Sequence, residues 1–405
     1  MPTNLCHDSL CATSLGCFVT PSLFGDGPRE VSSPSLFAEP TAQFLARASG
    51  EFWDAVRGLV SDWVGRFPAS ERADLTGRLL SPEDHHHRAA FLELYLHESL
   101  IRAGFGVEIH PVLANSDRQP DFLVHGSDEP FYLEARATAL ASKKVGSNRR
   151  IGEFYDALNK MDSPNFWLWV DVTSEGGTAL SVRKLRGPLT RWLEGLDPDV
   201  ESIYEEMPLF RWQRDGWDIE IRAEPKSPSS RGPGSTERPI AVYGSEQSWT
   251  DVEPLKRALE DKGSAYGALG HGFVVAVGTN LYADGNLNSL LYGSRDFTVV
   301  PTASETVETR RSDGYFTRPG AEKSHPHVSG LLVVNNLAPW WVADRRPTYW
   351  KNPAPDHDVA PSPAWDVMAL NDGLVEQSSA TVDPRSLFGL PDPWPPGPAF
   401  PEEDG

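Results

Sequence analysis

Residues 81–175 follow an ordered alternation of helical and β-type patterns. Apolar residues recur at helical spacing after Ser81, a good N-cap residue, and Gly104 provides the expected stop. The predicted order is helix, strand, strand, strand, helix, strand, over residues 81–104, 107–113, 121–126, 131–138, 147–161 and 166–172. Because strands and helices must cover one another's apolar faces, this order predicts an α/β fold with a mixed central sheet flanked by helices.

Composition and periodicity divide the rest of the chain around this core. Additional helices are expected before the core, and a second α/β region is expected after it. The predicted segments are a disordered leader (1–40), a helical N-terminal segment (41–80), the core (81–180), an extension of the core (181–224), a flexible linker rich in Pro, Gly and Ser (225–238), the second α/β region (239–351) and a Pro-rich, largely disordered tail (352–405).

Charge limits the partners that a chain of this composition can bind. The 405 residues carry a formal net charge of −20, which argues against binding nucleic acid through the whole surface. A nucleic-acid partner would require a local basic strip or metal ions that offset the repulsion. The three cysteines, Cys6, Cys11 and Cys17, all lie in one terminal segment and provide no disulfide framework.

Hydropathy and the N-terminal residues predict where in the cell the chain is located. No run of about 20 apolar residues occurs, so no membrane-spanning helix is expected. The first basic residue is Arg29, and the apolar stretch before it is too short for a secretory signal. The expected location is therefore the cytoplasm.

Two carboxylates and one cation stand at informative positions in the predicted hairpin. Pro120-Asp121 opens one strand, and after twelve intervening residues Glu134-Ala135-Arg136 lies within its partner strand. Side chains alternate along a strand, so Glu134 and Arg136 are expected on one face of the sheet. A hairpin can bring Asp121 to that face, where the three charged groups would converge.

Acidic groups crowded in this way favour a divalent cation. Two like charges a few ångströms apart repel strongly in a partly buried place, and carboxylate oxygens with water suit Mg²⁺. Glu93 on the preceding helix lies beside apolar positions of the helical wheel, so it is a candidate third ligand or orienting group. Arg136 stays protonated, so its expected role is to stabilise phosphate charge.

Taken together, these residues resemble the motif of the PD-(D/E)xK nuclease superfamily, which has the restriction-endonuclease-like fold. Pro120, Asp121 and Glu134 match the motif residue by residue, and Glu93 matches an acidic residue that many members carry on the first helix. The resemblance implies a metal-dependent nuclease that cleaves phosphodiesters with Mg²⁺ or Mn²⁺. It also implies that Asp121, Glu134 and Glu93 are metal ligands and that these residues and Arg136 form the catalytic site.

One departure from the motif bears on activity, because Arg136 occupies the place of the usual lysine. Lys160 on the following helix, or Lys143 and Lys144 just after the strand, could supply the missing ammonium group. The resemblance spans about residues 82–175, under a quarter of the chain. A catalytically inactive protein on the same fold that binds nucleic acid or a protein partner remains the alternative.

The local charge favours a nucleic-acid partner. The expected partner is DNA rather than RNA. Residues 131–160 contain six basic and three acidic side chains, a balance of +3 within a strongly acidic chain. The candidate nucleic-acid-binding residues of this strip are Lys143, Lys144, Arg149, Arg150 and Lys160. A purely structural interpretation also stands, in which Asp121 caps a turn and the other charges are ordinary exposed strand residues.

Overall fold

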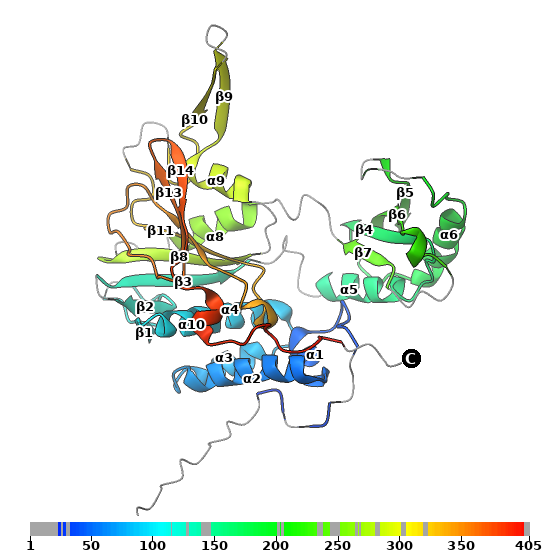
Figure 1. The fold of residues 1–405 in the computed structure, drawn as a ribbon, viewed down its shortest axis with the longest axis horizontal. Coiled ribbons are helices and arrows are strands. Elements are labelled where there is room, and N and C mark those ends of the chain that lie inside the picture. The colour runs from blue at the N-terminus through cyan, green and yellow to red at the C-terminus, as the bar shows by residue number, and fades with distance from the viewer. Residues whose placement is uncertain are drawn as a thin grey trace, which may run out of the picture.

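The computed structural model describes residues 23–25, 27–29, 33–114, 116–126, 129–138, 147–200, 203, 206–232, 238–243, 252–263, 266, 269–279, 284–300, 305–318 and 323–400. Within these residues the chain builds a large body around an eight-stranded sheet and a smaller body around a four-stranded sheet (Figure 1). No helix of the described residues is long and apolar enough to cross a membrane.

The eight-stranded sheet is mixed. Its strands, in spatial order, are β1 (Gly106–Ile109), β2 (Phe122–His125), β3 (Phe131–Ala137), β8 (Gly272–Thr279), β11 (Gly330–Asn335), β12 (Thr348–Lys351), β13 (Asp366–Asn371) and β14 (Leu374–Ser378). The central strands β3, β8 and β11 run parallel, and β1, β2 and β3 pair antiparallel as consecutive hairpins. The predicted α/β class with a mixed central sheet is confirmed.

Helices cover both faces of this sheet (Figure 1). The helices of the large body are α1 (Thr41–Arg47), α2 (Glu51–Arg66), α3 (Arg72–Leu79), α4 (Asp84–Arg102), α8 (Glu253–Gly263), α9 (Asp284–Tyr292) and α10 (Pro384–Phe388). Alternation along β3 divides its side chains between two apolar cores. Leu133 packs with Leu92 of α4 on one face, and Tyr132 packs with Leu259 of α8 on the other.

The smaller body is inserted in the chain between β3 and α8. Its elements are α5 (Ser147–Leu158), β4 (Phe166–Ser174), α6 (Val182–Glu194), β5 (Leu209–Arg214), β6 (Trp217–Pro225), a 3₁₀ turn (Pro228–Ser230) and β7 (Ile240–Tyr243). The strand order is β5-β6-β4-β7, and α5 and α6 share one apolar core with the sheet.

This insertion corrects the predicted composition of the core. The expected helix at 147–161 and strand at 166–172 both form, but they belong to the smaller sheet. The strongly apolar run 166–172 predicts a buried strand, yet the side chains of Trp167 and Trp169 are only partly buried. In the large sheet the elements that follow β3 are instead α8 and β8.

Two further boundaries differ from the sequence prediction. Residues 239–351 do not form a separate region, because β8, β11 and β12 continue the sheet begun by β1–β3. The expected disordered tail supplies β13, β14 and α10, and Phe388 packs against Trp63 with ring centroids 4.9 Å apart. Pro-rich composition weighed against order there, but a few buried aromatic side chains, each covering roughly 150–250 Å², fix the segment.

In the N-terminal part of the chain, the predicted helices form, and the predicted leader is described only in part. Residues 41–80 form α1, α2 and α3, as the apolar spacing indicated. The leader is described only in part; Phe24 is buried against the helices, and the three cysteines lie outside the described residues. The linker at 225–238 begins at the end of β6 and includes the 3₁₀ turn, and residues 233–237 lie outside the described part.

Candidate functional site

The β2–β3 hairpin places Asp121 opposite Glu134. Asp121 lies directly before β2, and the register pairs its neighbour Phe122 with Leu133 of β3. The Ala135 N–H donates to Asp121 Oδ2 at 2.6 Å, and the Asp121 N–H donates to Glu134 Oε2 at 3.3 Å. Each carboxylate is therefore held by the backbone beside the other, and the structure brings the two acidic groups together as expected.

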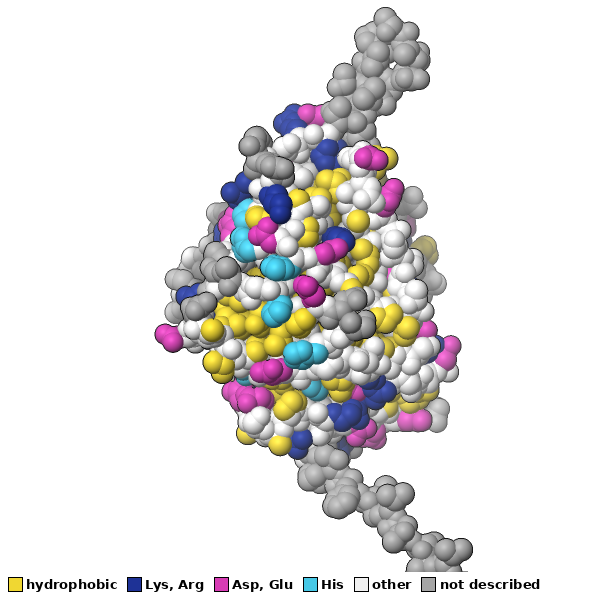
Figure 2. Space-filling model, turned by 90° about the vertical axis from the view of Figure 1, so that its left-hand side faces the viewer, with side chains coloured by type: hydrophobic (Ala, Val, Ile, Leu, Met, Phe, Trp, Pro, Cys, Tyr) yellow, Lys and Arg dark blue, Asp and Glu magenta, His cyan; other side chains and the backbone are white. Residues whose placement is uncertain are grey.

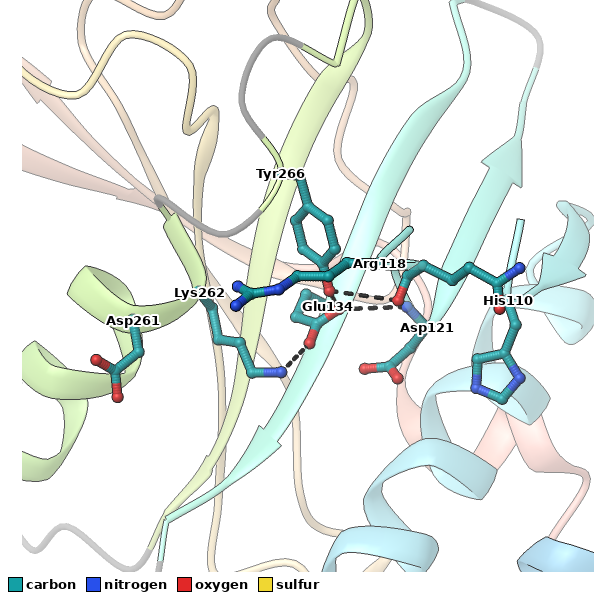
Figure 3. A pocket seen from close by; sticks show the side chains of 8 residues that line it. His110, Arg118, Asp121, Glu134, Asp261, Lys262 and Tyr266 are labelled. Atoms are coloured by element: carbon teal, nitrogen blue, oxygen red, sulfur yellow. Dashed lines mark hydrogen bonds and ion pairs between the residues drawn. The ribbon is translucent and has the colours of Figure 1, made fainter. Parts of the chain in front are cut away.

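Two residues from the end of α8 and just beyond it complete the arrangement (Figure 3). Lys262, near the end of α8, forms an ion pair with Glu134 Oε1. Tyr266, just beyond the helix, donates its hydroxyl hydrogen to Glu134 Oε2 at 2.6 Å. Glu134 is only 2% exposed, so its charge is compensated almost entirely by these protein groups.

The four side chains open into a pocket of about 600 Å³. The pocket is lined by His110, Arg118, Gln119, Asp121, Glu134, Asp261, Lys262 and Tyr266. In Figure 3 the Arg118 side chain extends across the pocket above Glu134, and the Lys262 ammonium group and the Asp121 carboxylate point into the same space. Acidic and basic groups thus face one cavity that is large enough to admit a small part of a ligand.

The electrostatics of the pocket disfavour a second negative charge. Burial, followed by repulsion from Glu134 and then from Glu93, raises the pKa of Asp121 from 3.8 to about 7. Burial and the hydrogen bond to Glu134 also raise the pKa of Tyr266, so this hydroxyl stays protonated and remains a donor. An added cation would relieve the repulsion at Asp121.

The structure does not bring Glu93 or Arg136 into the pocket lining. The carboxylate of Glu93 accepts two hydrogen bonds from the Arg78 guanidinium, both at 2.7 Å, so it already has a cation. Repulsion from its negative charge still contributes to the raised pKa of Asp121. Arg136 lies two residues beyond Glu134 on β3, with an exposed side chain, and no ion pair joins it to another described residue.

The three described residues of the predicted basic strip do not line the pocket either. Lys143 and Lys144 lie outside the described residues, whereas Arg149, Arg150 and Lys160 belong to the smaller body. Arg149 and Arg150 form ion pairs with neighbouring acidic side chains, and Lys160 is exposed. On the face shown in Figure 2, the described Lys and Arg side chains lie scattered among acidic and histidine side chains.

Sequence reasoning missed Lys262 and Tyr266. Lys262 stands 128 positions after Glu134 in the chain, and the whole smaller body lies between them. A signal for it did exist, because α8 is followed closely by the apolar strand β8, which resembles the helix–strand pair expected after the hairpin. The prediction instead used α5 and β4, the helix–strand pair that comes first after the hairpin in the chain.

The donor set is compatible with a hard divalent cation, although it is small. The described residues contain no group of three or more His, Cys, Asp or Glu side chains arranged to hold a metal ion. Mg²⁺ nevertheless binds through one or two carboxylates while water fills its remaining positions. The observation that fits such an ion is the close approach of the Asp121 and Glu134 carboxylates across the hairpin.

Comparisons with known proteins add no family to this description. No family model, no curated protein and no solved structure matches the chain. The functional interpretation therefore depends on the geometry and charges of the pocket.

Proposed function

We propose that this protein is a metal-dependent nuclease that hydrolyses phosphodiester bonds of nucleic acid in the pocket of Asp121 and Glu134. The observation that carries the proposal is the meeting of two carboxylates with the Lys262 ammonium group in one cavity. In the PD-(D/E)xK motif that the sequence resembles, an aspartate, an acidic residue and a lysine act together. Lys262 supplies from α8 the group that is missing at position 136.

The order of elements around the pocket gives independent support. When the smaller body is left aside, the chain runs α4, β1, β2, β3, α8, β8. This is the succession of helix, three strands, helix and strand that the resemblance implies. The hairpin contributes both acidic residues, and the next helix contributes the lysine.

In this proposal the residues divide the work by their chemistry. Asp121 and Glu134 would hold Mg²⁺ or Mn²⁺, which would activate a water and polarise the phosphate. Lys262 places a positive charge where negative charge develops on the phosphate oxygens. Tyr266 fixes the orientation of Glu134 through its hydrogen bond. Hydrolysis adds water across one P–O bond, leaving a phosphate monoester on one fragment and a hydroxyl group on the other.

The direct test is cleavage of labelled DNA and RNA by the full chain with Mg²⁺ or Mn²⁺, and in chelator. Cleavage is expected only when metal is present. Glu134→Gln is expected to lower the rate of cleavage about 100-fold, because the amide keeps one neutral oxygen that can bind the metal but loses the negative charge. Glu129→Gln, at an exposed position before β3, is the matched control and should cut normally. Equal cutting by wild type and Glu134→Gln would disprove the proposed site.

A second prediction concerns substrate binding by Arg118. Its guanidinium group lies across the pocket, and no ion pair joins it to another described residue. Arg118→Ala is expected to weaken binding of a labelled oligonucleotide in chelator about tenfold. It should also lower the slope of log affinity against log salt by about one, because one phosphate contact is lost.

Fluorescence anisotropy from about 50 to about 200 mM KCl measures both effects of the Arg118 substitution. The control is Arg311→Ala, outside the pocket lining, where the side chain is 62% exposed and paired with Asp296. An unchanged affinity and salt slope in Arg118→Ala would show that the phosphate does not enter the pocket at this side.

A further inference from the structure

Both carboxylate oxygens of Glu134 are already engaged by protein groups. Oε1 contacts the Lys262 ammonium group, and Oε2 accepts from the Tyr266 hydroxyl and from the Asp121 N–H. A carboxylate with both oxygens occupied in this way is not ready to bind a cation. One of these partners has to leave before a metal ion can take its place.

Asp121 is in a different position. Its Oδ2 accepts from the Ala135 N–H, and no ion pair joins its carboxylate to a basic side chain of the described residues. Among the described residues, Lys262 is the only lysine that contacts either carboxylate, and it contacts Glu134 alone. Asp121 therefore lacks a direct cationic partner, and a divalent cation between the two acidic groups would supply one.

Lys262 is the partner that can move. Its side chain is 27% exposed at the edge of the pocket, whereas the Glu134 side chain is 3% exposed. A lysine stem is flexible, and its ammonium group can turn toward water or toward a bound anion. Tyr266 and the Asp121 N–H would continue to hold Glu134 Oε2 when Lys262 leaves.

We propose that Lys262 is the internal counter-ion of the Asp121–Glu134 pair and that a divalent cation displaces it from Glu134. This inference rests on the metal dependence of the proposed function. Displacement frees the ammonium group to face the phosphate. Lys262 therefore competes with the metal ion for Glu134 before the reaction and stabilises negative charge on the phosphate during it. Removal of Lys262 should therefore strengthen metal binding while it weakens cleavage.

Titration calorimetry of the full chain with MnCl₂, without nucleic acid, tests the competition. Lys262→Met is expected to bind Mn²⁺ about tenfold more tightly than wild type, because no ammonium group has to leave. Lys256→Met on the same helix removes an exposed charge and is expected to change the affinity less than twofold. Equal or weaker Mn²⁺ binding by Lys262→Met would overturn the inference.

Two additions make the outcome decisive. Lys262→Gln keeps a hydrogen-bond donor for Glu134 and serves if the methionine variant does not fold; it should also gain affinity. At high KCl the gain should persist, because a buried contact is screened much less than a long-range field. A gain that disappears at high salt contradicts direct displacement.

The same proteins separate this inference from the proposed function. A tighter Mn²⁺ complex in Lys262→Met, together with no cleavage by wild type, supports the displacement and refutes the nuclease. Metal-dependent cleavage by wild type without any gain in Lys262→Met refutes the displacement alone. Absence of Mn²⁺ binding in both proteins refutes both.

Discussion

Lys262→Met is expected to lower the rate of cleavage at saturating Mg²⁺ about 10³-fold, whereas Arg136→Met is expected to lower it less than about tenfold. Lys262 points into the pocket and contacts Glu134, so its positive charge would act at short range on a phosphate bound there. Arg136 is exposed and outside the pocket lining, so solvent and salt screen its charge. The measurement is kcat for an oligonucleotide at saturating metal, which removes any effect of altered metal affinity.

Lys256→Met provides the control for this comparison, because it removes the same charge from an exposed position of α8. Its rate should match that of wild type. The reverse result, in which Arg136→Met is inactive and Lys262→Met is active, would show that Arg136, at the lysine position of the sequence motif, is the catalytic cation. The proposed role of α8 would then be wrong.

The parts of the site that lie close together in the chain could be predicted. Asp121 and Glu134 belong to one hairpin, whose register follows from a short turn and from alternating apolar residues. The helix α4 could also be predicted, because its apolar spacing and the glycine just beyond its end, Gly104, are local features. Local pattern thus predicted the two acidic residues and their meeting.

The lysine could not be predicted in the same way. Helical and strand patterns show that an element exists, but not which sheet it joins, so α5 and β4 were assigned to the wrong sheet. Only the pairing of β3 with β8 identifies α8 as the helix over the hairpin. The prediction that Glu93 joins the pocket does not hold for another reason: Arg78, from the neighbouring helix α3, already pairs with this partly buried carboxylate.

Asp121→Asn is expected to make the protein more stable by roughly 2 kcal/mol at pH 8 in chelator, because it removes a half-buried negative charge beside Glu134. The amide oxygen can still accept the hydrogen bond from the Ala135 N–H. The same substitution should abolish metal-dependent cleavage, since it removes a proposed ligand. Denaturant unfolding, followed as a function of pH, measures the change in stability.

The pH dependence gives this prediction its sign. The folded-state pKa of Asp121 is about 7, above the ordinary value of 3.8, so the native state binds more protons than the unfolded state between these values. The stabilising contribution of the protonated group is complete below about pH 4 and is lost as the pH rises through about 7. Wild type should therefore lose stability relative to Asp121→Asn across this range, and Mg²⁺ at pH 8 should restore stability to wild type only.

Asp117→Asn, an exposed substitution in the loop before β2, changes the net charge equally and should leave the pH profile of wild type intact. If Asp121→Asn is less stable than wild type at pH 8 in chelator, the Asp121 carboxylate does not destabilise the metal-free protein. Its role would then be that of a turn residue, held by the Ala135 N–H and compensated by Lys262. If the variant is more stable and Mg²⁺ stabilises only wild type, the repulsion that destabilises the empty pocket is also what creates its affinity for the ion.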